Sequence, residues 1–156
     1  MRLEIQEYPS TNSLVVLVRD TVLHEESFAL LELSRICRDY DTQAMTAEDF
    51  SNRKQVHIIF YDTRKALQCM HVIHADPRFS VVLDYAGGTN RSLVIPSGYS
   101  LDLLLTKFSK FGDIEKFWLG DQVVIDFFDS RSPVKVSRQL AGQFTLNIAN
   151  QLEMNA

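Results

Sequence analysis

Hydrophobic and polar residues alternate most clearly in a ten-residue stretch that occurs twice. Residues 55–64 read QVHIIFYDTR, and residues 122–131 read QVVIDFFDSR. In each copy every second residue of the first six is apolar, which is the period of a strand with one buried face: Val56, Ile58 and Phe60, then Val123, Ile125 and Phe127. Each copy continues into an acidic and a hydroxyl residue, which commonly begin a helix. The repetition predicts an internal duplication, with each unit built on a central strand that leads into a helix.

Both units are predicted to follow the order strand, helix, strand, strand, helix, strand. In the first unit, residues 12–85, we expect strands at 13–19, 42–46, 54–61 and 79–85 and helices at 25–40 and 64–75. In the second unit, residues 91–150, we expect strands at 92–96, 115–119, from 122 and at 144–149. Its helices are expected to begin at Ser100 and at Ser132-Pro133 and to end at Gly112 and Gly142. The Gly-rich residues 86–90 are the expected linker, and residues 1–11 and 151–156 the flanks.

Composition narrows the possible functions and compartments. The 156 residues carry a formal net charge of −4 and have a pI near 5.5, so nucleic-acid contact needs a local basic patch. The first residues lack the apolar core of a signal peptide, and no apolar run approaches membrane-spanning length. Cys37 and Cys69 lack metal-site spacing and predict buried thiols in a reducing compartment, the nucleus or cytoplasm. We expect no cofactor, no metal site and no membrane association.

The doubled element order is the split-βαβ, ferredoxin-like plan. Together with the segments FYDTRKALQCM and KFGDIEKFWLGDQVVIDFFDSR, it makes residues 12–149 resemble tandem RNA-recognition motifs (RRMs). The amino-acid sequence of these segments most resembles the meiosis-regulator-like members of that family. The resemblance implies an α+β fold with two four-stranded antiparallel sheets, each carrying two helices on one face. It also implies a non-catalytic function in binding single-stranded RNA within a ribonucleoprotein or RNA-processing complex.

The positions at which RNA-recognition motifs stack bases on aromatic rings hold other residues in this chain. Alignment of the third-strand signature on Phe60 places Arg53 at the basic position and Lys54 at the glycine position. The two stacking positions then hold Gln55 and His57. The equivalent positions in the second unit and in the two first strands hold Gln122, Val124, Leu17 or Val15, and Val94. Because each stacked base contributes about 1–3 kcal/mol, these losses predict weak or unconventional RNA contact.

Trp118 is the residue of the second sheet best suited to replace a missing ring. The inward phase of Phe117 and Leu119 places Trp118 on the outer face, beside Gln122 or Val124. There it either offers a surface to a base or is covered by another part of the chain.

The outer face of the first sheet is predicted to be unusually apolar. Its residues are Val15, Leu17, His57 and Ile59, with Arg19 at one side. An apolar face of this kind needs a cover. Either another part of the same chain covers it, or a protein partner docks on it.

The densest basic cluster consists of Arg53-Lys54 and Arg64-Lys65, at or near the repeated strand. It either contacts phosphates or forms a solvated surface whose field is weakened by neighbouring acids. Because Arg64 and Arg131 recur two residues after an acid, we expect a structural ion pair at each helix start.

Two hypotheses for function remain open. The first is a non-catalytic RNA-binding module with weak contact to RNA, and the second is a pair of degenerate motifs that serves as a protein–protein interaction scaffold. The candidate binding residues for RNA or a partner are Trp118, Gln122, Val124, Gln55, His57, Arg53, Lys54, Leu17 and Arg19. The sequence contains no nucleophile elbow and no phosphate-binding glycine loop, so we expect no enzyme activity.

Overall fold

The structure, a computed structural model, describes residues 11–85, 91–144 and 147–149. These residues fall into two compact units, which we name unit one (within residues 9–89) and unit two (within residues 90–156). The predicted linker at 86–90, nearly all of the predicted flanks and residues 145–146 of the predicted last strand lie outside the described residues.

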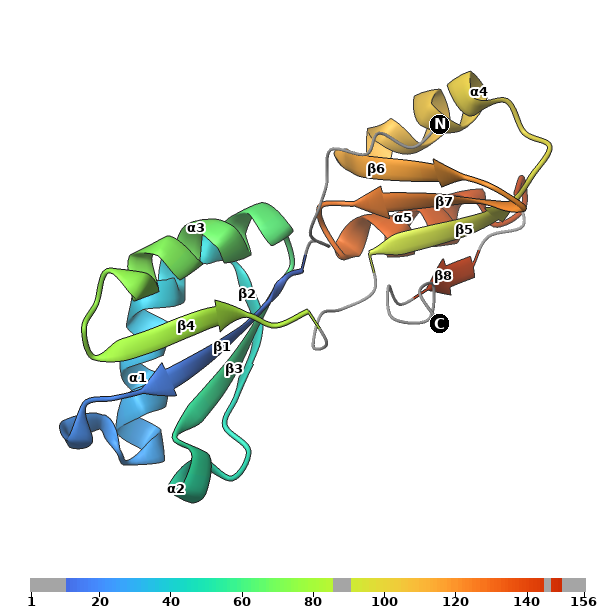
Figure 1. The fold of residues 1–156 in the computed structure, drawn as a ribbon. Helices are drawn as coiled ribbons and strands as arrows, with labels where there is room; N and C mark the ends of the chain where they lie inside the picture. Colours follow the sequence, from blue (N-terminus) through green and yellow to red (C-terminus); the bar gives the residue numbers. More distant parts are fainter. Residues whose placement is uncertain (1–10, 86–90, 145–146, 150–156) are drawn as a thin grey trace. The chain divides into compact units, whose positions relative to one another are not determined.

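Unit one forms a four-stranded antiparallel sheet in the order β2-β3-β1-β4 (Figure 1). Its strands are β1 (Ser13–Val18), β2 (Thr42–Thr46), β3 (Gln55–Phe60) and β4 (Phe79–Leu83). Its helices are α1 (Glu26–Cys37), α2 (Phe50–Arg53) and α3 (Thr63–His74), with 3-10 turns at Thr21–Leu23 and Arg38–Tyr40.

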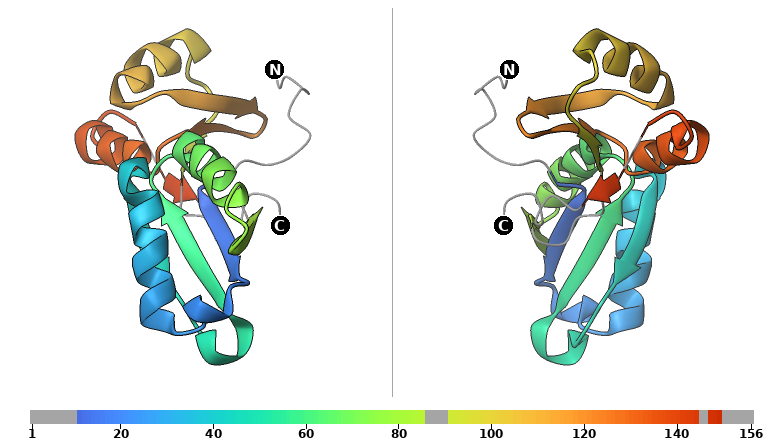
Figure 2. Two further views of the ribbon diagram at one scale, coloured as in Figure 1. Left: turned by 90° about the vertical axis from the view of Figure 1, so that its left-hand side faces the viewer. Right: turned by 90° about the vertical axis from the view of Figure 1, so that its right-hand side faces the viewer.

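Unit two repeats this plan in the order β6-β7-β5-β8. Its strands are β5 (Ser92–Pro96), β6 (Ile114–Leu119), β7 (Gln122–Phe127) and β8 (Asn147–Ala149). Its helices are α4 (Leu101–Phe108) and α5 (Arg131–Leu140), with a 3-10 turn at Ser109–Phe111. The predicted fold class is confirmed: the chain is α+β, with two ferredoxin-like βαββαβ units whose main helices lie on one face of each sheet (Figure 2).

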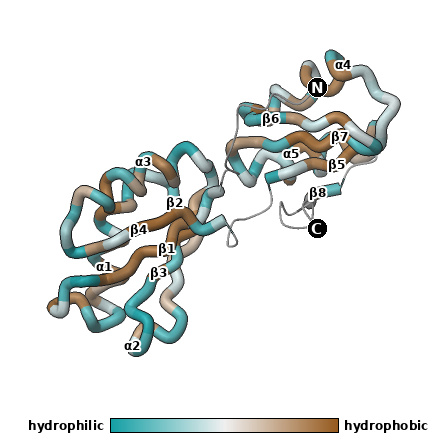
Figure 3. Tube along the Cα trace, in the orientation of Figure 1, coloured by the Kyte–Doolittle hydropathy of each residue, from teal (hydrophilic) through white to brown (hydrophobic). Residues whose placement is uncertain are grey.

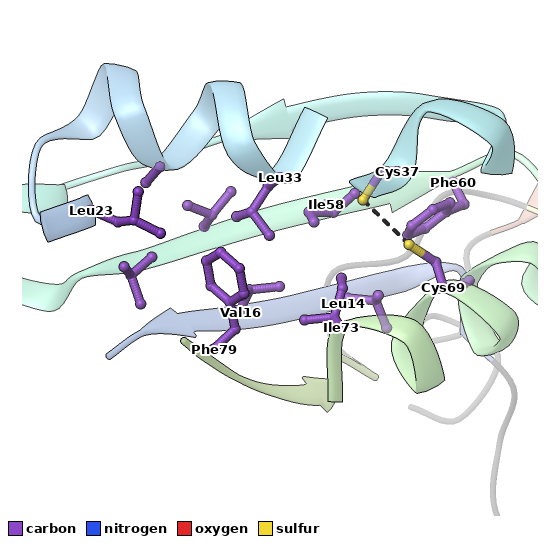
Figure 4. Close-up of a cluster of buried hydrophobic side chains, with 14 of the residues drawn as sticks. Leu14, Val16, Leu23, Leu33, Cys37, Ile58, Phe60, Cys69, Ile73 and Phe79 are labelled. Atoms are coloured by element: carbon purple, nitrogen blue, oxygen red, sulfur yellow. Dashed lines mark hydrogen bonds between the residues drawn. The ribbon is translucent and has the colours of Figure 1, made fainter. Parts of the chain in front are cut away.

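Each unit buries one apolar core between its sheet and its two main helices. In unit one the core residues include Leu14, Val16, Leu33, Cys37, Ile58, Phe60, Cys69 and Ile73 (Figure 4). In unit two they include Leu93, Ile95, Leu104, Phe108, Val123, Ile125, Phe127 and Val136. Figure 3 shows β1 and β4 among the most apolar parts of the trace. Phe60 and Phe127 are fully buried, which confirms the strand phase that alternation predicted.

Two local predictions were wrong, and one short helix was missed. Leu119 shares the inward phase but is 48% exposed at the last position of β6, and it does not join the core cluster of unit two. Helix α5 begins at Arg131, so Ser132 and Pro133 are buried first-turn residues and not the cap. Helix α2 was not predicted at all, since its single turn lies between two left-handed residues, Asp49 and Lys54, which no periodic pattern reveals.

The edge strands β2 and β6 carry a bulge at the same place of the repeat. The pairing of β2 with β3 runs from Thr42 opposite Phe60 to Ala44 opposite Ile59, so residue 43 is extra. In unit two, Ile114 pairs with Phe127 and Lys116 with Asp126, so residue 115 is extra. Each bulge therefore lies beside the buried phenylalanine that ends the central strand.

Candidate binding faces of the two sheets

The outer face of the first sheet, opposite α1 and α3, is open and mostly aliphatic. Strand alternation and register place on it Val15, Leu17, Gln55, His57, Ile59 and Val82. Val82 is 62% exposed and Leu17 is 40% exposed, while the others are half-buried. A sheet face with this much accessible aliphatic surface is a candidate for a binding partner.

Val15 lies at the centre of this face. It is paired with His57 in β3 and with Val82 in β4. The next outward residue of β1, Leu17, is paired with Gln55. The structure thus brings the predicted residues Leu17, Gln55 and His57 together on one surface.

Polar contacts mark the two ends of the same face. At one end the exposed Arg19 donates from Nη1 to Ser80 Oγ at 3.3 Å. At the other end Asp84 Oδ2 accepts from Ser13 Oγ at 3.3 Å and lies 3.7 Å from His57 Nδ1. The aliphatic surface therefore has a cationic end and an anionic end.

The predicted basic residues Arg53 and Lys54 contact their own chain. Arg53, at the end of α2, lies 3.8 Å from the Asp49 carboxylate. Lys54 Nζ donates to the His24 carbonyl at 3.3 Å and lies 5.2 Å from the centroid of the Phe50 ring. The Asp49 carboxylate therefore offsets part of the charge of Arg53, whereas the contacts of Lys54 leave its positive charge in place.

The predicted ion pairs at the two helix starts are confirmed. Arg64 Nη2 lies 2.8 Å from Asp62 Oδ2, and Arg131 Nη2 lies 2.7 Å from Asp129 Oδ2. The Asp62 side chain also accepts from the Arg64 backbone N–H at 2.8 Å. Although burial acts in the opposite direction, the hydrogen bonds from Arg64 lower the pKa of Asp62. These two arginines hold the start of α3 and of α5.

Trp118 lies on the outer face of β6, directly opposite Val124 of β7, as alternation predicted. Its ring is half-buried. The indole Nε1–H donates to Asp126 Oδ2 at 3.3 Å, and Lys116 Nζ lies 5.2 Å from the ring centroid. The indole is therefore held in one orientation by a carboxylate and has an ammonium group beside it.

Asp126 is the centre of a polar cluster beneath Trp118. Its side chain is 2% exposed and accepts from the hydroxyl of Ser92, which is fully buried. Lys116 Nζ lies 4.0 Å from Asp126 Oδ2. A buried carboxylate requires such partners, because an unpaired charge in the interior is costly. The cluster fixes the position of the tryptophan.

The other predicted residues of the second sheet differ in accessibility. Gln122 is exposed at the first position of β7, where it pairs with Pro96 of β5. Val124 is only 8% exposed and Val94 only 6%, although both belong to the outward phase. Trp118 and Gln122 are thus the predicted residues of this face that a ligand can reach.

The residues that support these faces were not predicted from the sequence. Asp126 is the one acidic residue in the strand Gln122–Phe127, which is otherwise mostly apolar. An acid in such a strand indicates that its side chain needs a buried partner. A second buried pair, Arg91 with Glu115, lies at the start of β5: Arg91 Nη1 donates to Glu115 Oε1 at 3.0 Å and to the Phe127 carbonyl at 2.8 Å. In unit one Asn12 occupies the equivalent place, and its Nδ2 donates to the Phe60 carbonyl at 2.6 Å.

Residues 11–85, 91–144 and 147–149 contain neither a candidate metal site nor a candidate membrane-spanning helix. No three His, Cys, Asp or Glu side chains within those ranges converge as metal ligands. No helix within them has the length and apolar character required to cross a membrane.

No protein-family model and no curated protein sequence matches the chain. Several solved structures are similar in fold. RNA-recognition domains 1 and 2 of Sex-lethal from Drosophila melanogaster share 14% identity at a TM-score of 0.34, over 89% of this chain and all of that one. The first two RRM domains of the yeast poly(U)-binding protein Pub1 share 10% identity at 0.35, over 88% of this chain and 99% of that one. The C. elegans NONO-1 homodimer shares 14% identity at 0.41, over 86% of this chain and 58% of that one.

Proposed function

We propose that the chain is a non-catalytic RNA-binding module of the RNA-recognition type, which contacts single-stranded RNA weakly and acts within a ribonucleoprotein complex. The observation that carries this proposal is the Trp118 platform, which comprises Trp118, Lys116 and Asp126. An accessible indole on the outer face of a sheet offers a base a surface for stacking. The neighbouring Lys116 ammonium adds a positive charge near this surface, which the Asp126 carboxylate 4.0 Å away offsets in part.

The contacts around the platform favour stacking over chemistry. Asp126 is buried and hydrogen-bonded to Ser92 and Trp118, so its carboxylate positions the ring and is not presented to a ligand. The half-buried indole presents part of its surface, and Gln122, exposed on the same outer face, can add a hydrogen bond to a base edge.

The same surfaces limit the affinity. A single stacked base contributes about 1–3 kcal/mol, and the stacking positions of unit one hold Gln55 and His57 among aliphatic residues. Arg53, Arg64 and Arg131 are paired with carboxylates, and the whole chain carries a net charge of −4. Binding is therefore expected in the micromolar range and to weaken as salt rises.

Trp118 is the only tryptophan of the chain, so its fluorescence reports on the platform directly. The full chain is titrated with mixed-sequence single-stranded RNA at low and at physiological salt, and both RNA anisotropy and tryptophan emission are recorded. Saturable binding with the same midpoint in both signals, weaker at the higher salt, is the expected result. RNA binding without any change in emission, or no binding at low salt, would overturn the proposal.

A matched control separates the platform from general loss of apolar surface. Leu103 is 42% exposed on α4, away from the sheet face. Trp118→Ala should weaken RNA binding, whereas Leu103→Ala should leave it unchanged. Equal affinities for both variants would place the RNA contact elsewhere.

The second candidate function is a protein-interaction scaffold, and the aliphatic outer face of unit one favours it. Val82 and Leu17 present apolar side chains that contribute little to RNA contact but suit a protein anchor residue. Val82→Glu places a charge on this face at an edge strand, and Leu31→Glu places one on α1, where Leu31 is 64% exposed. After RNase treatment, a partner captured by the wild type and by Leu31→Glu but lost with Val82→Glu would support the scaffold. Identical capture by all three chains would contradict it.

A further inference from the structure

Two cysteines from different helices meet in the core of unit one. Cys37 is the last residue of α1 and Cys69 lies within α3. Their sulfur atoms are 3.3 Å apart, and both side chains are free thiols with at most 1% exposure (Figure 4). From the sequence we predicted only that each thiol is buried, and the function proposed above uses neither cysteine.

The geometry allows a covalent bond with a small movement. A disulfide has a sulfur–sulfur distance of about 2.05 Å, so the two atoms must approach by roughly 1.3 Å from their present 3.3 Å. Cys37 lies where α1 gives way to a 3-10 turn that ends at the left-handed Asp41. A helix terminus adjusts its backbone more easily than a helix interior. The required movement thus falls at the adaptable end of α1.

We propose that Cys37 and Cys69 form a conditional intramolecular disulfide that fastens α1 to α3 when the chain meets a peroxide. One thiolate attacks an oxygen of hydrogen peroxide, so that an S–O bond forms, the O–O bond breaks and water leaves after protonation. The second thiol then attacks the sulfenic sulfur, the S–S bond forms and a second water leaves. Two thiols lose two electrons and one peroxide gains two.

The reaction is expected to be slow in the folded chain. The hydrogen bond to Cys69, together with burial, raises the pKa of the Cys37 thiol, so this side chain is protonated at neutral pH. The thiolate is the reactive form and both sulfurs are shielded, so oxidation requires a transient opening between α1 and α3. The pair is therefore expected to form a disulfide slowly, under prolonged oxidation, and not to act as a rapid redox sensor.

Closure would stabilise the unit against unfolding. The bond encloses β2, α2 and β3 in a loop that runs from residue 37 to residue 69. Loop-closure entropy for about 33 residues corresponds to a decrease of at most roughly 500-fold in the unfolding equilibrium constant of unit one. A higher midpoint in urea is the measurable consequence.

The experiment uses the full chain, treated with hydrogen peroxide under native conditions and then alkylated. The expected product has lost two hydrogens per chain, contains linked Cys37 and Cys69 peptides, and forms at the same rate at all protein concentrations. Its urea midpoint, followed by circular dichroism, should exceed that of the reduced chain and return after dithiothreitol. Cys37→Ala and Cys69→Ala each remove the link and should show no peroxide-dependent shift.

Three results would overturn the proposal. The first is a folded chain that still has both thiols free for alkylation after a peroxide treatment strong enough to oxidise the urea-unfolded chain completely. The second is a product that contains only sulfinic acids or intermolecular dimers. The third is a linked chain whose urea midpoint is equal to or below that of the reduced chain. The comparison of reduced and oxidised wild type is decisive even if an alanine variant fails to fold.

Discussion

Replacement of Arg91 by methionine tests whether unit two depends on a buried ion pair. Arg91 is 1% exposed, and its guanidinium contacts both the Glu115 carboxylate and the Phe127 carbonyl. Methionine fills a similar volume with an apolar chain but cannot pair with Glu115, whose side chain is only 10% exposed. The variant therefore leaves a mostly buried carboxylate without its arginine.

The expected cost follows from the loss of this arginine contact in a buried setting. Removal of one partner from a buried ion pair typically costs about 3–5 kcal/mol, whereas replacement of both by apolar residues is often close to neutral. Arg91→Met should thus destabilise unit two by about 3 kcal/mol or more. The double variant Arg91→Met/Glu115→Leu should recover most of this stability. It should remain about 1 kcal/mol less stable than the wild type, because the hydrogen bond to the Phe127 carbonyl is still missing. The coupling energy between the two positions is expected to be at least about 2 kcal/mol, because the cost of Glu115→Leu alone adds to this recovery.

Tryptophan emission provides the assay, because Trp118, the only tryptophan of the chain, lies in β6 of unit two. Urea titrations of the wild type, the two single variants and the double variant give the free energy of unfolding and the coupling energy. Arg91→Asn, which introduces the residue that unit one uses at this place, is a further control. It should restore the carbonyl contact in part but not the contact with Glu115.

Additive effects would refute this reasoning. If the double variant is as unstable as the sum of the single variants, the Arg91–Glu115 contact contributes nothing specific, and the burial of Arg91 serves packing alone. A wild-type stability for Arg91→Met would have the same meaning.

Three further predictions concern the core, the platform and the pH dependence. Phe127→Ala and Phe60→Ala should each lower the free energy of unfolding in urea by about 3–5 kcal/mol, because both rings are fully buried. A stable Phe127→Ala protein that only loses binding would show that the ring lies on the outer face of the sheet. Trp118→Ala should lower the melting temperature only modestly, because Asp126 loses the indole N–H but keeps Ser92 and Lys116, and should weaken RNA binding roughly 5- to 150-fold in a titration; a large drop in melting temperature would show instead that the ring belongs to the core. Acid should destabilise unit one below about pH 5, because the lowered pKa of Asp62 means that the unfolded chain binds a proton first as the pH falls. In the Asp62→Asn variant the urea midpoint should depend less steeply on pH in this range. An unchanged dependence on pH would show that the Asp62–Arg64 pair contributes nothing to the acid sensitivity.

Periodicity in the sequence was enough to predict the fold and the phase of its central strands. Alternation in the two copies of the repeat placed Phe60 and Phe127 in the cores and Trp118 on an outer face, and the structure agrees at all three positions. Such patterns work because one face of each strand must be buried, so a register error would expose the whole apolar set.

Contacts between residues far apart in sequence could not be predicted in this way. The Asp126–Ser92 and Arg91–Glu115 pairs join separate strands, and their partners follow from register and from a bulge that no local pattern specifies. Leu119 obeyed the inward phase, but the strand ends there and the side chain lies outside the core cluster. Alternation thus indicates which face a side chain occupies, whereas its burial depends on what packs above it.

The bulges at residues 43 and 115 also bear on how the protein behaves when it is concentrated. A regular edge strand presents evenly spaced N–H and C=O groups, on which a strand from another molecule can add and start a fibre. One extra residue in β2 and one in β6 break this spacing at one edge of each sheet. At the opposite edges, the described part of β8 has three residues, whereas β4 has five regular residues and an exposed Val82. Among the described strands, β4 is therefore where self-assembly would begin, and a partner that covers it would also keep the chain from aggregating.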